Sequence, residues 1–190
     1  MCKVAMQQCT GQLQLPLNNL GIIALDYQGK KGIGTALGHA SISALIDPEA
    51  GSRLAIAESL TNLIWAPIAD NIKGVSLSAN WMWPAKNLGE NARLYRAVEA
   101  VSKFAIDLGI NIPTGKDSLS MTQKYPNGEV VYAPGTVIIS AIGEITDLKK
   151  AVTPVIQTKL GTKLIYLNLS NSRYELGGSS FAQSLNKIGC

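Results

Sequence analysis

Two stretches of the sequence repeat apolar residues at helical spacing. Asp47 can cap free backbone amides and Pro48 suits a first helical turn, so a helix is predicted from residue 48 to about 64. A second helix is predicted over 91–108, where Gly109 stops it. We expect a core to cover Leu54, Ile56, Ala57, Leu60, Leu63 and Ile64 of the first, and Leu94, Val98, Val101, Ala105 and Leu108 of the second.

Shorter apolar runs predict strands. They cover residues 20–25, 74–78, 130–132 and 136–145, and Pro134-Gly135 between the last two indicates a hairpin-like pair. Residues 41–46 form a further apolar segment, which Asp47-Pro48 ends. Residues 79–87 and 114–120 are interpreted as loops.

The composition changes between residues 149 and 162, where prolines and polar residues gather. We therefore expect one domain over 1–148. A strand over 163–169 and a helix opening at 177–180 would then belong to a second α/β domain. One strand and one helix cannot close a core, so 149–190 is expected to be a linker and the truncated beginning of that domain.

Composition narrows the class of protein. Hydrophobic residues make up 46% of the 190 residues and charged residues 16%, which is enough to bury a core. No apolar run has the roughly 20 residues that span a membrane, and no signal peptide is recognisable, so a cytoplasmic protein is expected. Cys2, Cys9 and Cys190 are interpreted as free thiols. His39 alone cannot complete a zinc site with them, and a nucleophilic Cys9–His39 pair has no supporting signature.

The net charge of +4 raises the question of nucleic-acid binding. The basic residues are scattered, and the only adjacent basic pairs are Lys30-Lys31 and Lys149-Lys150. No aromatic residues alternate with them in a way that would stack bases. Neither a nucleic acid nor a membrane is therefore expected as a partner.

Two polar patterns are candidates for chemistry. Glu58 and Asn62 lie one helical turn apart, away from the apolar stripe, and their oxygens suit a hard cation such as Mg²⁺. A solvated helix face is the alternative. Gly115-Lys116-Asp117-Ser118 combines a glycine that admits an anion, a cation and a carboxylate, without the spacing of a Walker A loop. An ordinary surface turn is the alternative there.

Trp81 and Trp83 flank Met82 and precede Pro84 in the predicted 79–87 loop. Two indoles in a loop can wall a purine or a partner surface. Equally, the loop can fold onto the core of its own domain.

Several segments together resemble one enzyme family. They are Leu15–Asn19 (LPLNN), Glu58–Asn62 (ESLTN), Leu77–Trp81 (LSANW) and Ile112–Met121 (IPTGKDSLSM). Their order resembles the large, single-chain phosphoribosylformylglycinamidine synthases over essentially the whole chain. The match is to the second of the two duplicated synthetase halves.

The resemblance implies an α+β fold, with a mixed, mainly antiparallel sheet and helices on one face, as in the N-terminal domain of aminoimidazole ribonucleotide synthetase. It implies an ATP-dependent amidotransferase of purine biosynthesis. ATP activates formylglycinamide ribonucleotide, and ammonia from glutamine displaces phosphate. ATP or ADP and Mg²⁺ are the implied cofactors, with one catalytic and one auxiliary nucleotide site.

The resemblance also implies roles for individual residues. Glu58, Asn62 and Asn19 correspond to metal ligands at the auxiliary site, although many members have an aspartate where Asn19 stands. Asn18 would approach the nucleotide there. Asp117 would bind metal, and Gly115, Lys116 and Ser118 nucleotide, at the catalytic cleft.

The resemblance further implies that this piece works with the remaining domains of a longer enzyme. Alone, it is expected to lack activity and to form a homodimer through an exposed apolar sheet face. Two alternatives remain: another synthetase or kinase of the same superfamily, or a nonenzymatic domain that docks a partner through Trp81 and Trp83.

Overall fold

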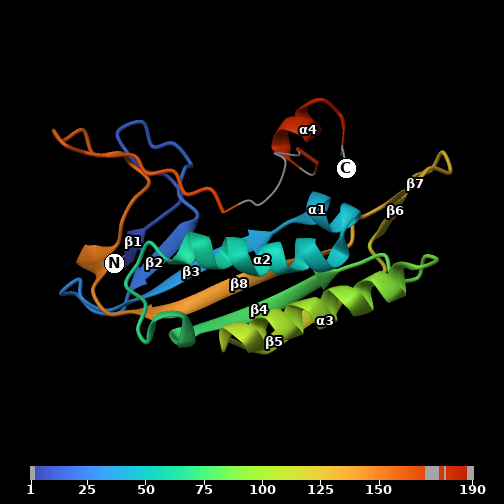
Figure 1. Cartoon of the computed structure of the whole chain (residues 1–190), viewed down its shortest axis with the longest axis horizontal. Helices are drawn as coiled ribbons and strands as arrows, with labels where there is room; N and C mark the ends of the chain where they lie inside the picture. Colours follow the sequence, from blue (N-terminus) through green and yellow to red (C-terminus); the bar gives the residue numbers. More distant parts are fainter. Residues whose placement is uncertain (1–2, 170–175, 178, 188–190) are drawn as a thin grey trace.

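The computed structural model describes residues 3–169, 176–177 and 179–187, and its main body has two layers (Figure 1). One layer is a six-stranded sheet in the order β1 (Val4–Met6), β2 (Leu20–Ala24), β3 (Gly32–His39), β8 (Thr136–Ile145), β4 (Val75–Met82) and β5 (Asn111–Ser118). Neighbouring strands are antiparallel except β4 and β5, which are parallel. This confirms the predicted α+β class.

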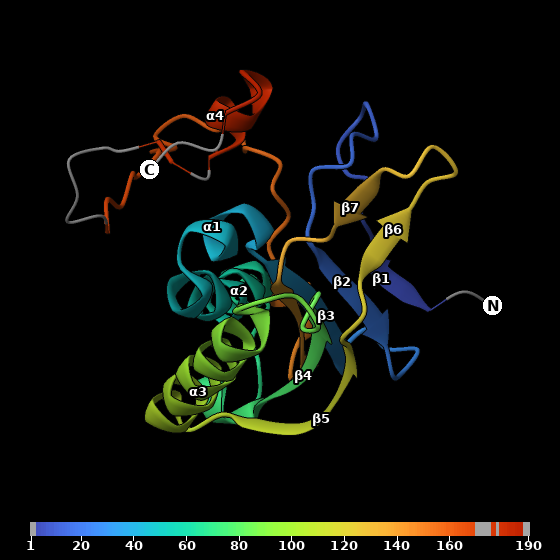
Figure 2. The same cartoon turned by 90° about the vertical axis from the view of Figure 1, so that its right-hand side faces the viewer.

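Helices cover one face of this sheet (Figure 2). They are α1 (Ser41–Ile46), α2 (Pro48–Leu63) and α3 (Glu90–Leu108), with a short 3-10 helix, η1 (Asn71–Gly74), before β4. The predicted start of α2 is confirmed, because the Asp47 carboxylate accepts hydrogen bonds from the amides of Glu49 (2.9 Å) and Ala50 (3.0 Å). The predicted end of α3 before Gly109 is also confirmed.

Strand alternation decides which side chains lie under the helices. In β3, Gly34, Ala36 and Gly38 are buried, whereas Thr35 and Leu37 face away. The face without helices, called the open face below, carries one residue in two from each strand. It includes Thr35, Leu37 and His39 of β3, Ser140 and Ile142 of β8, and Ser76 and Ser78 of β4.

Helix α2 approaches the sheet through small residues, which corrects the predicted stripe. Ile56 and Leu63 are buried as predicted, and Leu60 is half-buried, but Leu54 and Ile64 are exposed, Ile64 by 64%. The buried stripe passes instead through Gly51, Ser52, Ala55 and Ser59. At Gly38 of β3 an added Cβ would lie 2.0 Å from the Ala55 carbonyl oxygen, so the close approach of the α2 backbone requires glycine at position 38.

In α3 the predicted helical period is correct, but the buried stripe passes through Ala97 and not through Val98. Ala97, Val101 and Ala105 are buried and Leu94 is half-buried, whereas Val98 is 42% exposed. Small residues at 97 and 105 turn this side of the helix toward α2. The predicted burial of Val98 was therefore wrong.

Two predicted loops are strand in their first part. β4 extends through Trp81 to Met82, and β5 covers residues 111–118. Since β4 lies between β8 and β5, its backbone groups find partners on both sides. That pairing outweighs the low strand propensity of Ser78 and Asn80.

The predicted hairpin was also wrong. β7 (Val130–Tyr132) pairs with β6 (Thr122–Lys124), whereas β8 pairs with β3 and β4. The β6–β7 hairpin projects beyond the end of the sheet (Figure 1).

Beyond β8 lie the 3-10 helix η2 (Leu148–Lys150) and the short helix α4 (Ser180–Ser184), which Ser179 caps as the predicted start suggests. The predicted strand at 163–169 is absent, because no strand in the described part of the chain lies beside this segment to form a ladder with it. The division into domains 1–148 and 149–190 stays a prediction.

None of the helices in the described ranges has the length and apolar character to cross a membrane. The cytoplasmic location stays a prediction. Cys9 is a half-buried free thiol, and Cys2 and Cys190 lie outside the described residues.

Candidate functional site

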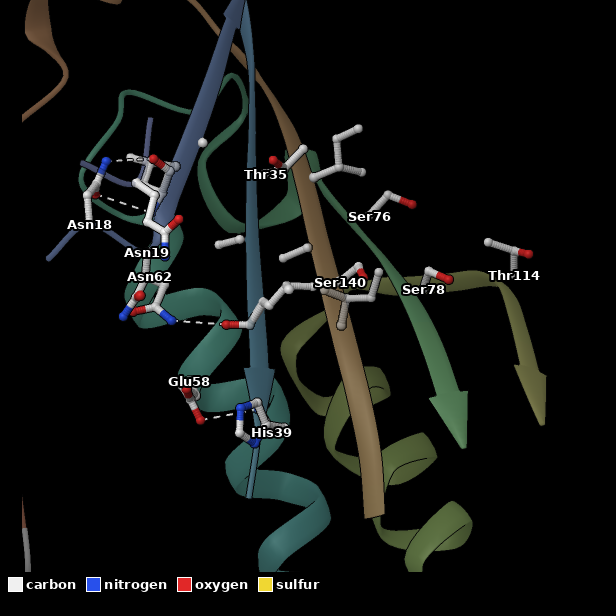
Figure 3. Close-up of a pocket in the computed structure, with 18 of the residues that line it drawn as sticks. Asn18, Asn19, Thr35, His39, Glu58, Asn62, Ser76, Ser78, Thr114 and Ser140 are labelled. Carbon is white, nitrogen blue, oxygen red and sulfur yellow. Dashed lines mark hydrogen bonds between the residues drawn. The ribbon is translucent and has the colours of Figure 1, made fainter. Parts of the chain in front are cut away.

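Strand β3 is longer than its neighbour β2, and this leaves part of one edge open. Their first pair is Leu20 with Ala36, so residues 37–39 have no partner on that side. Two side chains of α2 take the place of a strand. Asn62 Nδ2 donates to the Leu37 carbonyl oxygen at 3.0 Å, and Glu58 Oε2 accepts from the His39 amide at 3.2 Å (Figure 3).

The segment before β2 brings two asparagines to the same place. Asn18 is 8% exposed, and its side-chain amide donates to the carbonyl oxygens of Gln7 (2.9 Å) and Leu20 (2.7 Å). Its Oδ1 accepts from the Leu20 amide at 3.2 Å. Asn18 therefore fixes this segment, and the exposed Asn19 beside it is free to face a ligand.

These residues line a hollow of about 810 Å³, called the β3-edge hollow below. Asn19, Asn62, Glu58 and His39 lie along one side of it (Figure 3). The other side is the open face of the sheet, with hydroxyl groups from four strands: Thr35, Ser140, Ser76, Ser78 and Thr114. Ser78 is paired directly with both Ser140 and Thr114, so these three hydroxyls form a row across β8, β4 and β5.

The donors in the hollow are almost all neutral oxygens. Glu58 is the one carboxylate, and no group of three His, Cys, Asp or Glu residues in the described part of the chain could hold a metal. Because Glu58 Oε2 and Asn62 Nδ2 are used on β3, Glu58 Oε1 and Asn62 Oδ1 are left for a ligand. This set fits a hard cation that completes its shell with water and phosphate, and not a soft or thiolate-bound metal.

The second group of predicted site residues lies on a different strand, away from the β3-edge hollow. Gly115, Lys116, Asp117 and Ser118 are on β5, at the opposite edge of the sheet from β1, and none of them lines the β3-edge hollow. Lys116 Nζ donates to Ser118 Oγ at 2.6 Å. Glycine is required at position 115 for packing, because an added Cβ would lie 2.5 Å from the Ala79 carbonyl oxygen of β4.

The tryptophans fold onto their own domain. Trp83 is fully buried, and its Nε1 donates to Glu90 Oε2 at 2.8 Å. Trp81 is half-buried against the core, with its ring centroid 6.5 Å from that of Trp83. Of the two interpretations, packing on the core is correct, and Trp83 cannot wall a purine or a partner.

Sequence reasoning did not identify the hydroxyl row or the position of His39. The alternating serines at 76 and 78 were a signal, because residues two apart on a strand share a face. The hypothetical Cys9–His39 pair gains no support, since His39 lines the hollow and Cys9 does not.

Most of the chain matches one known domain family. Residues 2–144 match the model of the FGAR-AT PurM_N-like domain. The chain belongs to this family. The resemblance found in the sequence is thereby confirmed.

Relatives of this FGAR-AT PurM_N-like chain are long enzymes. It is 44% identical over 188 residues to the probable phosphoribosylformylglycinamidine synthase of Caenorhabditis elegans. It is 42% identical over 187 residues to the Homo sapiens phosphoribosylformylglycinamidine synthase. Each alignment covers 98% of this chain, and the chain spans only 14% of the length of each relative.

Solved structures agree on the fold of this family. Phosphoribosylformylglycinamidine synthase II of Thermotoga maritima has a TM-score of 0.54 at 17% identity, covering 72% of this chain and 21% of that one. T. maritima PurL complexed with ADP gives 0.53 at 15% identity, covering 81% and 27%. At these identities the likeness shows the fold alone.

Proposed function

We propose that this chain is part of the synthetase region of a phosphoribosylformylglycinamidine synthase. That ligase uses ATP and glutamine to convert formylglycinamide ribonucleotide into formylglycinamidine ribonucleotide. The proposal is supported by the names of the relatives and by T. maritima PurL structures described as complexes with ATP, ADP and FGAR.

Within that enzyme, the β3-edge hollow is the auxiliary site for Mg²⁺ and a nucleotide. One observation carries this assignment: Glu58 and Asn62 of α2 meet Asn19 from the segment before β2 at the same hollow. Glu58 Oε1, Asn62 Oδ1 and the Asn19 side chain would hold the ion. The ion would neutralise phosphate charge. Asn18 was expected to approach the nucleotide; because its side chain is hydrogen-bonded to Gln7 and Leu20, we propose instead that it positions Asn19.

The four predicted site residues on β5 belong to a different site of the longer enzyme. Gly115, Lys116, Asp117 and Ser118 form one wall of the catalytic cleft, which other domains of the longer enzyme complete. The exposure of this edge strand in the described structure is compatible with such a neighbour. Because catalysis depends on positioning by both walls, the isolated chain should show no ammonia-dependent synthase turnover. Measurable turnover by the purified chain would contradict this.

The open face is proposed to pair with the same face of a second copy. Ile23, Leu37 and Ile142 supply exposed apolar surface there. The row of hydroxyls from Ser140, Ser78 and Thr114 makes part of this face polar. We therefore expect a concentration-dependent dimer in sedimentation, and a monomer at all concentrations would contradict the proposal.

The auxiliary site can be tested with a variant that spares the fold. Glu58→Gln keeps an oxygen to accept from the His39 amide and removes only the charge, whereas Glu58→Ala would also leave the β3 edge open. At a Mg·ADP concentration ten times its Kd, the wild-type chain should gain about 1.4 kcal/mol, or roughly 3–6 °C in Tm.

Glu58→Gln should lose this shift. Glu99→Gln, an exposed change on α3, is the matched control and should keep it. An equal shift in wild type and Glu58→Gln would remove Glu58 from the site.

A further inference from the structure

Five lysines gather at one end of the sheet, far from the residues used above. They are Lys3, Lys30, Lys31, Lys149 and Lys150, called the lysine cluster below. The two adjacent basic pairs, scattered in the sequence, are brought together by a hydrogen bond of 2.8 Å from the Leu148 amide to the Lys30 carbonyl oxygen. Lys3 joins them because its carbonyl oxygen accepts from the Ala24 amide at 2.8 Å. Figure 1 shows β1, the β2–β3 turn and the end of β8 at this end.

The carboxylates near the cluster are mostly engaged by backbone. Asp26 accepts from the amides of Gln28 (2.8 Å), Lys30 (3.1 Å) and Lys31 (2.7 Å), and Asp147 accepts from the Lys149 amide at 3.1 Å. In the described residues, Glu144 is the one carboxylate within 4.0 Å of a cluster ammonium, 3.9 Å from Lys31 Nζ. Among the residues that the structure describes, four of the five ammonium groups therefore have no acidic partner at that distance.

Two lysines of the cluster, Lys3 and Lys149, line a hollow of about 390 Å³ together with Asp26 and Tyr27 among others. Lys3 Nζ lies 4.4 Å from the centroid of the Tyr27 ring, a cation–π contact that orders this lysine. Tyr27 is 78% exposed; Val4, which lines the same hollow, and Leu25, two residues before Tyr27, are also exposed. The surface thus combines unpaired positive charge with apolar side chains.

We propose that the lysine cluster is a docking surface for an acidic protein segment. The lysines come from three chain segments, and Lys30, Lys31 and Lys150 do not line the hollow that Lys3 and Lys149 share, so the five match separate charges along an extended partner. A compact phosphate inside the hollow would meet the Asp26 carboxylate. The exposed Tyr27, Val4 and Leu25 offer contact to apolar side chains of a peptide, which a nucleic-acid backbone lacks.

This surface is independent of the proposed function. Asn19 precedes the first residue of β2, whereas Asp26 and Tyr27 follow its last residue, so the cluster and the β3-edge hollow lie at opposite ends of that strand. A partner docked on the cluster leaves the nucleotide site open.

The test uses the whole chain and a fluorescent decapeptide of eight glutamates and two leucines, with binding followed by anisotropy at low and moderate salt. Lys30→Gln/Lys149→Gln/Lys150→Gln removes three cluster charges. Lys103→Gln/Lys124→Gln/Lys159→Gln removes three exposed charges elsewhere and is the matched control. The cluster variant should bind the peptide about eightfold more weakly, because three exposed charge pairs contribute about twofold each. The control should change less than about twofold, and both should keep the wild-type Tm.

Three results would overturn the proposal. They are the absence of peptide binding by the wild-type chain at low salt, an equal loss in the two triple variants, and binding of pyrophosphate or a single-stranded oligonucleotide as tight as that of the peptide. The last would assign the cluster to phosphate chemistry instead.

Discussion

The side-chain amide of Asn62 donates a hydrogen bond of 3.0 Å to the backbone carbonyl of Leu37, which stands 25 residues earlier in the chain. This bond joins α2 to the part of β3 that extends beyond β2. Asn62 therefore has a structural task through its nitrogen and a proposed ligand task through its oxygen. Variants at the site have to separate these two.

Asn62→Asp separates the two roles of this residue, because it should weaken the structural hydrogen bond and strengthen the binding of the ion. A carboxylate cannot donate to the Leu37 carbonyl, so metal-free unfolding in urea should show a loss of about 1 kcal/mol. The added charge should enlarge the stabilisation by Mg²⁺. Gln12→Glu, an exposed change of the same kind, should show neither effect. A variant as stable as wild type without metal would contradict the structural role.

Asn19→Asp should tighten Mg·ADP binding about tenfold in calorimetry, because it adds a carboxylate to a hollow that has one. Its neighbour provides the control. Asn18→Asp loses two buried donors to carbonyl oxygens and should cost about 3 kcal/mol of stability without improving binding. If Asn19→Asp left the affinity unchanged, Asn19 would lie outside the ion's reach.

The register of α3 can be tested with a matched pair of truncations. Val101 is 2% exposed, so Val101→Ala should lower the free energy of unfolding by about 2 kcal/mol. Val98→Ala, one turn earlier on the exposed side, should cost less than about 0.5 kcal/mol. Equal losses in the free energy of unfolding would contradict this register and favour the stripe predicted from the sequence, in which Val98 is buried.

Asp26 predicts a pH dependence. The backbone amide of Lys31, then those of Lys30 and Gln28, hold the pKa of this carboxyl below its ordinary value of 3.8. A lowered pKa in the folded state gives a stabilisation that is complete above pH 3.8 and is lost as the pH falls through the folded-state pKa.

Asp26→Asn should therefore destabilise the chain at pH 6 and narrow the difference in urea midpoint between pH 6 and pH 3. Lys30→Ala keeps the backbone amide and is expected to keep that difference. An Asp26→Asn variant with the full wild-type pH dependence would contradict the assignment.

Local signals in the sequence predicted the ends of the helices well. Asp47-Pro48 and Gly109 act through their own backbone geometry, which needs no knowledge of the rest of the fold. The buried stripe of α2 was harder, because Gly51 and Ser59 are buried by close approach to α1 and the sheet and not by their hydrophobicity. Strands β4 and β5 were missed in part because their partners decide them.

For the candidate site, the period of α2 placed Glu58 and Asn62 on one strip. Their meeting with Asn19 depends on the register of β2 on β3, which no local pattern encodes. The resemblance to a family supplied that third residue. The hydroxyl row depends on three strands whose order, β8-β4-β5, is not the order of the sequence.

The central claim, that the β3-edge hollow holds a metal-bound nucleotide, is tested most directly with Mn²⁺·ADP. Its paramagnetism broadens nuclear magnetic resonance signals close to the ion. The account predicts that substoichiometric Mn²⁺·ADP first broadens the signals of the Asn19 and Asn62 side-chain amides and of the His39 backbone amide. The backbone amide signals of Val131 and Lys149 should stay sharp. Selective broadening at other residues, with Asn19, Asn62 and His39 unaffected, would contradict the claim.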